Sequence, residues 1–268
     1  ISAIDVHAHI GTYRGATHRI LDHWMSATPA LLAARAREAG IALVFVSPLR
    51  ALLPRGHGQP VAGNREAARA VARNPPLRQW VVVDPGQPAT YRQAERMLKD
   101  ARCIGIKIHP EEHRYPIRRY GRDLMRFAAE HGAVVQTHSG ERNSLPEDFV
   151  PLANEFPEVT LILSHLGCGW DDDPTHQVRA IQRSRHGNIF TDTSSARSIL
   201  PGLIEWAVRE VGTDRILFGT DAPCYFTAMQ RARIDHAAIP ARAKALILRD
   251  NALRLFASRI TRQQAAVS

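Results

Sequence analysis

Short apolar runs recur along almost the whole chain, each separated from the next by a longer segment with a different rhythm. The runs are rich in Val, Ile and Leu and are apolar on both faces, which is typical of strands buried between two layers of structure. They predict strands at Ala3–His7, Ile41–Ser47, Gln79–Val83, Cys103–Ile108, Ala133–His138, Val159–Ser164, Asn188–Asp192 and Arg215–Gly219.

The longer segments are rich in Ala, Leu and Arg, and their apolar residues recur three or four positions apart, as in helices with one buried face. Gly40 and Gly132 follow two of these segments, where glycine is favoured because a helix commonly ends in a left-handed residue. The predicted helices are Ala30–Ala39, Gly63–Arg73, Tyr91–Ala101, Tyr120–His131, Pro146–Phe156, Pro174–Arg185, Leu200–Val211 and Ala241–Phe256.

This alternation predicts the α/β class, with parallel strands joined by helical crossovers. A (β/α)8 TIM barrel suits a chain of 268 residues, so we expect one domain over residues 1–268 with a polar tail after about residue 257. A doubly wound open sheet is the alternative. Such sheets often carry a Gly-rich phosphate turn after the first strand, whereas this chain has His7-Ala8-His9-Ile10-Gly11 there.

Composition limits the classes of molecule that this protein is expected to bind. The net charge is +9, but the basic residues are nearly all Arg scattered through the helical segments, so we expect a small anionic molecule and no nucleic acid. No apolar run approaches the ~18 residues that a membrane span needs. The 3 cysteines form no CxxC pair, and no charged leader precedes an apolar segment. These features favour a cytoplasmic protein without a disulfide framework.

Histidines and one aspartate stand at the predicted strand ends. His7 and His9 end the first strand on one face, and this pair alone is weak evidence for a metal site. His138, His165 and Asp221 follow at the fifth, sixth and eighth strands. The carboxyl ends of barrel strands form one mouth, so these side chains should converge there. Imidazoles with a carboxylate are a common ligand set for zinc or a similar divalent ion.

Several short motifs carry a family resemblance in addition. They occur in the order Asp5-Val6-His7-Ala8-His9, Gly105-Ile106-Lys107-Ile108-His109-Pro110, Thr137-His138-Ser139-Gly140, Leu163-Ser164-His165-Leu166-Gly167 and Leu217-Phe218-Gly219-Thr220-Asp221-Ala222-Pro223. Together with the Asn251–Phe256 ending they resemble the amidohydrolase superfamily. More narrowly, they resemble the amidohydrolase-2 branch, which includes aminocarboxymuconate-semialdehyde decarboxylase and related metal-dependent hydrolases.

The resemblance implies a role for each strand-end residue. His7 and His9 match the first-strand metal pair, and His138 matches the metal ligand of the fifth strand. Asp221 matches the aspartate that binds the metal and handles the proton of its bound water, and His165 matches a catalytic or orienting histidine. The expected cofactor is one divalent ion, Zn²⁺ first and Mn²⁺ second, which lowers the pKa of bound water to about 7.

Lys107 and His109, at the end of the fourth strand, have several possible roles. A lysine at this place in two-metal relatives is carbamylated and bridges the metals, which would imply a second metal here. Alternatively, Lys107 stays cationic and holds a substrate carboxylate, or it forms a structural ion pair. His109 either lines the pocket or caps the following loop, and we do not predict it to be a metal ligand.

Loop residues after the strands are candidates for substrate binding. Arg14 and Arg197 are placed to hold a carboxylate, and Trp170 is placed to cover a planar group. Arg142 and Tyr225 also follow strand ends and are further candidates, and for all five the alternative is an ordinary loop residue. A nucleophilic role for Cys224, beside the Asp221 loop, is not expected, because the metal already supplies a nucleophile.

Three functions remain open from the sequence. The first is a metal-dependent hydrolase that cleaves an amide, ester or lactone in a small anionic molecule. The second is a non-oxidative decarboxylase or hydratase that acts on a carboxylated small molecule with the same metal site. The third is a catalytically inactive binding barrel, which the filled metal and proton-transfer positions disfavour. Homologous barrels often dimerise, so a homo-oligomer is a further possibility.

Overall fold

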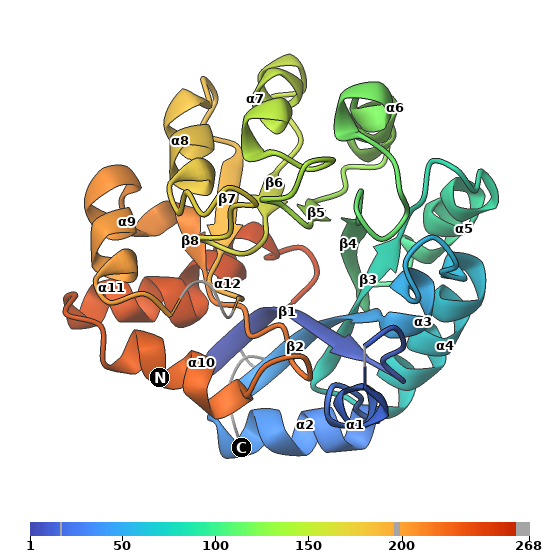
Figure 1. Cartoon of the computed structure of the whole chain (residues 1–268), viewed down its shortest axis with the longest axis horizontal. Coiled ribbons are helices and arrows are strands. Elements are labelled where there is room, and N and C mark those ends of the chain that lie inside the picture. Colours follow the sequence, from blue (N-terminus) through green and yellow to red (C-terminus); the bar gives the residue numbers. More distant parts are fainter. Residues whose placement is uncertain (17, 196–198, 261–268) are drawn as a thin grey trace.

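The computed structural model describes residues 1–16, 18–195 and 199–260. Its eight strands are parallel and follow one another around the sheet in sequence order. Figure 1 shows the helices arranged around this ring of strands. The strands are β1 (Ala3–Ile10), β2 (Ile41–Pro48), β3 (Leu77–Val82), β4 (Cys103–Ile108), β5 (Val135–Thr137), β6 (Leu161–Leu163), β7 (Ile189–Asp192) and β8 (Ile216–Leu217).

The ends of β1 and β8 meet and bring the sheet round into a barrel. The Val6 backbone N–H donates to the Phe218 carbonyl at 2.9 Å, and the His9 N–H donates to the Ala222 carbonyl at 2.6 Å. A parallel bridge joins Ala8 to Ala222 just beyond β8. The strand order and this closure confirm the TIM barrel and exclude the doubly wound sheet.

The helices lie where the sequence predicts them, with three additions. The short α1 and α3 and the later α10 were not predicted, and α1 has no buried residue, so it shows no apolar period. The helices are α1 (Arg19–Trp24), α2 (Pro29–Glu38), α3 (Leu49–Leu52), α4 (Pro60–Arg73), α5 (Ala89–Met97), α6 (Ile117–Glu130), α7 (Pro146–Glu155), α8 (His176–Arg183), α9 (Leu203–Val211), α10 (Thr227–Asp235), α11 (Ala241–Ala245) and α12 (Asn251–Leu255). A π-helical turn over Leu246–Asp250 joins α11 to α12.

An aromatic cluster fills the barrel near the strand beginnings. Phe45, Trp80 and Phe256 pack edge to face, with ring centroids 5.0–6.1 Å apart. The Trp80 indole N–H donates to the Val6 carbonyl at 2.8 Å, so the ring is fixed inside the barrel. Phe256 brings the end of the chain against this cluster. The barrel interior is therefore packed at this end, whereas a cavity lies at the carboxyl ends of the strands.

Part of the predicted polar tail belongs to this packing. Ile260 is buried in the same cluster, and Arg259 donates to the Leu98 carbonyl at 2.7 Å. Residues 261–268 of the predicted tail lie outside the described residues. None of the described helices is both long enough and apolar enough to span a membrane.

Candidate metal centre and cavity

A β-bulge in β1 turns its two histidines into the barrel. Ile4 and Val6 pack in the interior cluster, whereas Ala8 and Ile10 pack against the helices. Regular alternation would put all four on one face and the histidines on the other. The register shift between Asp5 and Ala8 reverses the alternation. The bulge is why His7 and His9 point inward together.

Both imidazoles are held through Nδ1. His7 Nδ1 lies 3.1 Å from Asp192 Oδ2 and 2.9 Å from Ser194 Oγ. His9 Nδ1 lies 2.8 Å from Ser47 Oγ. Fixing one ring nitrogen in this way leaves Nε2 directed at the cavity, which is the usual arrangement of a metal-binding histidine.

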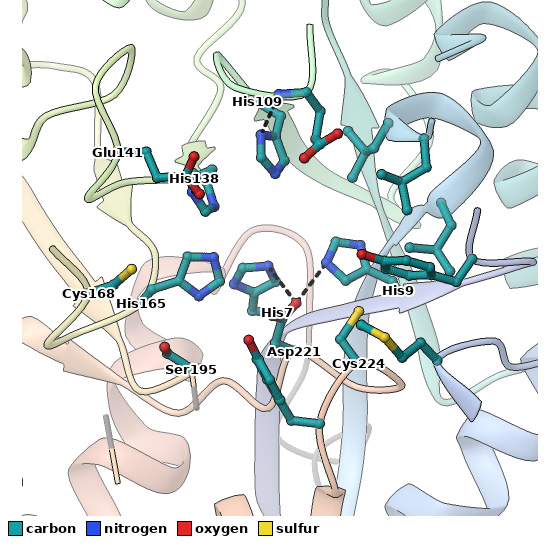
Figure 2. Close-up of a pocket in the computed structure, with 17 residues that line it drawn as sticks. His7, His9, His109, His138, Glu141, His165, Cys168, Ser195, Asp221 and Cys224 are labelled. Atoms are coloured by element: carbon teal, nitrogen blue, oxygen red, sulfur yellow. Dashed lines mark hydrogen bonds and ion pairs between the residues drawn. The ribbon is translucent and has the colours of Figure 1, made fainter. Parts of the chain in front are cut away.

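Asp221, in the segment after β8, lies close to the Nε2 atoms of His7 and His9. Its Oδ1 lies 2.9 Å from His9 Nε2 and 3.6 Å from His7 Nε2 (Figure 2). Burial raises the pKa of Asp221, but the hydrogen bond from His9 and the nearby His7 and His165 together bring that pKa well below its ordinary value. The carboxylate is therefore ionised at neutral pH, as a metal ligand must be.

Two groups of side chains among the described residues are compact enough to hold a metal ion. One comprises His7, His9 and Asp221, and the other comprises His7, His165 and Asp192, each with ligand atoms within 4.8 Å of one another. The hydrogen bonds favour the first, because Asp192 is already saturated. It is completely buried, whereas Asp221 and His9 line the cavity.

Asp192, at the end of β7, is buried beneath the cavity and holds several site residues by hydrogen bonds. Its Oδ2 accepts from His7 Nδ1 and, at 3.2 Å, from Gln136 Nε2. Its Oδ1 accepts from the backbone N–H groups of His165 and Ser194, both at 3.1 Å, and from the Ser194 hydroxyl. Sequence reasoning missed Asp192, Ser194 and Gln136, because their contacts with His7, His165 and Lys107 are long-range and no local pattern indicates them.

His165 faces the cavity with a defined tautomer. Its Nδ1 lies 2.6 Å from the Ser194 carbonyl oxygen, which only accepts, so Nδ1 carries the proton. Burial and the neighbouring His138 lower the pKa of His165 to about 3. The ring is therefore neutral, with the lone pair of Nε2 available as a proton acceptor.

His138 lies on the same cavity but outside the most compact group. Its ring centroid is 4.8 Å from that of His165 and 4.4 Å from that of His109, with the His109 and His138 rings stacked. His138 Nε2 bonds to Glu141 Oε1 at 3.2 Å. The structure thus brings all three predicted imidazole ligands and Asp221 to one mouth, with Glu141 as an unforeseen partner of His138.

The cavity at this mouth has a volume of about 260 Å³. Imidazoles and Asp221 form one side, and an aliphatic wall of Met25, Leu49, Leu52 and Leu53 forms another. Figure 2 shows His7, His9, His138, His165 and Asp221 directed toward one another within it. Its other lining residues are Tyr13, His109, Glu112, Glu141, Cys168, Ser195, Cys224 and Tyr225.

Lys107 lies beneath the cavity rather than on its wall. The side chain is completely buried and is not among the lining residues. Its Nζ lies 3.2 Å from His7 Nε2 and 3.3 Å from Gln136 Oε1. Burial lowers the pKa of Lys107 to about 8, against the opposing pull of Asp192 and Asp221. Lys107 thus contacts a predicted metal ligand directly.

The candidate loop residues are dispersed. Arg14 lines a separate hollow with Arg50 and His57. Trp170 is about half exposed and stacks under the Arg142 guanidinium at 4.6 Å, beside a hollow that adjoins the cavity at Glu141 and Cys168. Of the loop candidates within the described part of the chain, only Tyr225 and Cys224 line the cavity itself. Arg197 lies outside the described residues.

His165 and Asp221 both have left-handed backbone conformations, with φ of 73° and 54°. This region costs a non-glycine residue on the order of 1–3 kcal/mol and persists where the surroundings enforce it. Here the His165 N–H is held by Asp192, and the Asp221 N–H donates to the His7 carbonyl at 2.7 Å. Such strain is concentrated at functional sites.

The fold resembles several solved decarboxylases. A 5-carboxyvanillate decarboxylase from Sphingomonas paucimobilis aligns with a TM-score of 0.74 and 16% identity over 97% of this chain and 99% of that chain. A dihydroxybenzoic acid decarboxylase from Polaromonas sp. JS666, with bound manganese and the inhibitor 2-nitroresorcinol, gives 0.74 and 17% over 97% and 98%. A 2,6-dihydroxybenzoate decarboxylase complexed with 2,6-dihydroxybenzoate gives 0.72 and 17% over 96% and 99%.

No curated protein matches the sequence. At the identities above, the structural likeness shows the fold. The family rests on a separate finding, because the model of a family described as Amidohydrolase matches residues 4–257. The buried His/Asp cluster at the barrel mouth could hold a metal ion. The chain therefore belongs to the amidohydrolase-2 family of metal-dependent enzymes.

Proposed function

We propose that this protein is a metal-dependent, non-oxidative decarboxylase of a small aromatic carboxylic acid. The observation that carries the proposal is the cavity, where a cluster of imidazoles and a carboxylate faces an aliphatic wall within about 260 Å³. Such a space suits a single ring with an apolar face and a polar substituent. The similar structures support this choice, since one contains 2,6-dihydroxybenzoate and another manganese with 2-nitroresorcinol.

The donor set fits a divalent metal ion. His7, His9 and Asp221 would hold it, with His138 as a fourth ligand that would exchange its bond to Glu141 for the ion. Manganese in the similar decarboxylase supports Mn²⁺ here beside the expected Zn²⁺. A bound ion would neutralise a substrate carboxylate and polarise its oxygens. That supply of positive charge matters, because no Arg or Lys is among the described lining residues.

Asp221 and His165 are the groups of this chain that would transfer the proton. In the reaction, the bond between the ring carbon and the carboxylate breaks, its electron pair stays on the ring carbon and takes up a proton, and CO₂ leaves. Asp221 is ionised and His165 is neutral, so both can accept a proton from the substrate or solvent and return it to the ring carbon.

Hydrolysis remains the second candidate, favoured by the same two proton acceptors. A hydrolase needs a base for the attacking water, and both ionised Asp221 and neutral His165 have that character. Nothing in the aliphatic wall requires an aromatic substrate rather than a lactone or ester. The two reactions differ in their products, which makes them separable by one experiment.

That experiment uses purified protein loaded with Mn²⁺ or Zn²⁺ and a panel of aromatic acids, lactones and esters in ¹⁸O-labelled water. Decarboxylation predicts CO₂ release from an acid and a ring-protonated product that carries no ¹⁸O at the reacting carbon. Incorporation of ¹⁸O into a carboxylate product, without CO₂, would replace the proposal with hydrolysis. Turnover of no compound by fully loaded protein would favour the inactive binding barrel.

A further inference from the structure

His109, at the end of β4, has a tautomer that the loop after it fixes. The Glu112 backbone N–H donates to His109 Nδ1 at 3.3 Å, so Nδ1 holds a lone pair and the proton of the neutral ring is on Nε2. The loop is held in place, since the His113 N–H donates to the His109 carbonyl at 3.0 Å. Figure 2 shows the His109 ring directed into the cavity, across from Asp221. His109 therefore offers a fixed N–H donor to a ligand.

Glu112 offers the opposite group on the same wall. Its Oε1 accepts from Arg55 Nε at 3.2 Å and from Arg55 Nη2 at 2.9 Å. Its Oε2 is buried and has no hydrogen-bond partner among the described residues, although the side chain lines the cavity. A buried carboxylate oxygen without a partner is costly, and it gains most from a ligand that donates a hydrogen bond.

We propose that His109 and Glu112 form a hydroxyl-selecting pair, in which His109 Nε2–H donates to a substrate hydroxyl and Glu112 Oε2 accepts from it. A hydroxyl is the smallest group that meets both demands, because its oxygen accepts while its proton is donated. Methoxy and halide substituents leave Glu112 unpaired, and an amino group accepts poorly from His109. A site built in this way strongly rejects an analogue that lacks the hydroxyl.

This inference rests on the proposed function, because it takes the substrate to be an aromatic acid whose carboxylate lies at the His7 and Asp221 side. His109 faces that side across the cavity. The selected hydroxyl is therefore on the part of the ring remote from the carboxylate. The substrate class becomes a ring-hydroxylated aromatic acid, in which the hydroxyl is recognised by groups other than the metal ligands.

Glu112→Gln gives the sharpest test. The two donors of Arg55 hold the amide oxygen of glutamine in the place of Oε1, so the amide NH₂ replaces Oε2. An acceptor becomes a donor with little change of shape. Calorimetric binding to the metal-loaded protein is measured for ortho-, meta- and para-hydroxybenzoate and for their methyl ethers. For the meta or the para position, we expect wild-type protein to bind the hydroxy acid roughly 10- to 100-fold more tightly than the ether.

In Glu112→Gln that preference should fall to about equality or reverse, since the new donor favours the ether oxygen. Glu66→Gln is the matched control, because Glu66 is an exposed carboxylate near Arg50 that does not line the cavity, and it should keep the wild-type ratio. Unchanged selectivity in Glu112→Gln would overturn the proposal. Wild-type protein that binds no hydroxy acid more tightly than its ether would overturn it too.

His109 is tested by separating its two nitrogens. His109→Asn keeps an acceptor near the position of Nδ1 for the Glu112 N–H but loses the donor, so the hydroxyl preference should drop roughly 5- to 20-fold. His109→Gln places an amide N–H near the position of Nε2 and should recover most of it. Equal selectivity in both variants would exclude His109 as the donor.

Binding and turnover separate this inference from the proposed function. A hydroxyl preference that depends on His109 and Glu112, without CO₂ release from any bound acid, would contradict decarboxylation and leave the pair in its role. CO₂ release from methyl ethers as readily as from hydroxy acids would support decarboxylation and contradict the hydroxyl-selecting role of His109 and Glu112.

Discussion

Asp221 combines a position beside two imidazole nitrogens with a fixed ionised state. Asp221→Asn keeps the shape but removes the negative charge and the proton acceptor. We expect turnover to fall by about 10²- to 10⁴-fold while the fold is retained. Steady-state kinetics with parallel circular dichroism would measure both. Activity close to wild type in a folded variant would remove Asp221 from the mechanism.

Lys107 is the residue whose role the structure narrows most. The lysine is buried against His7 and does not line the cavity, so it has no direct route to a substrate carboxylate. For Lys107→Met we expect the KM of an aromatic acid to change by less than about threefold, while kcat falls because His7 loses a neighbour. A tenfold rise in KM with an unchanged kcat would instead assign Lys107 to substrate binding.

The sequence predicts which residues gather at the barrel mouth but not how deep each side chain lies. His7, His9, His138, His165 and Asp221 are recognisable because each lies in or just after the carboxyl-terminal part of a strand. Lys107 is in β4 and His109 directly follows it, so a difference of two positions places one below the cavity and the other on its wall. Arg14 and Trp170 depend on loop conformations, which no local pattern specifies.

At the scale of elements, β1 shows that the orientation of the two histidines in its motif depends on a bulge in the folded barrel. The strand pattern predicts its location, but regular alternation would turn its histidines outward. The bulge between Asp5 and Ala8 corrects this, and it is stabilised by Asp5, which accepts from the His7 and Thr220 backbone N–H groups at 3.0 Å each. A bulge of this kind depends on a contact with Thr220, 215 residues away in the segment after β8, which a local sequence pattern does not contain.

Cys103, at the start of β4, should make the stability of the fold depend on pH in the alkaline range. Burial raises the pKa of this thiol from 9.0 to about 12. Above pH 9 the unfolded chain loses the proton while the folded chain keeps it, so stability should fall with rising pH until about pH 12. The slope approaches about 1.4 kcal/mol per pH unit.

Urea unfolding of wild-type protein and Cys103→Val between pH 8 and about 10.5 isolates this contribution as a difference between two curves. The unfolding free energy of wild-type protein minus that of Cys103→Val should decrease steadily as the pH rises, because the valine has no proton to lose. Parallel pH dependence in the two proteins would show that the thiol ionises as easily in the folded state as in the unfolded one.

For the whole molecule, the candidate metal site links β1 to the segment after β8 at the closure of the barrel. We expect about one divalent ion per chain in protein purified without chelator, and about two if Lys107 is carbamylated. Removing the ion should abolish turnover and lower Tm, since a ligand that binds only the folded state stabilises it by mass action. Metal analysis with thermal scans before and after chelation would check this. Full activity in metal-free protein would contradict the central assignment.

The barrel itself was predictable from the sequence, because its strands are buried on both faces and keep an apolar signal throughout. The predicted termini were less accurate. β5 and β6 are shorter than the predicted runs Ala133–His138 and Val159–Ser164, by two residues at the start and one at the end of each. Helices such as α1 that bury no residue carry no periodic signal at all.

The left-handed backbones of His165 and Asp221 have a consequence for engineering this protein. Glycine adopts those conformations without penalty. Asp221→Gly and His165→Gly would therefore relieve strain while deleting the groups that move protons. A library of this chain selected for heat resistance alone should drift toward such changes and lose turnover, so any search for a tougher enzyme has to score catalysis at every round.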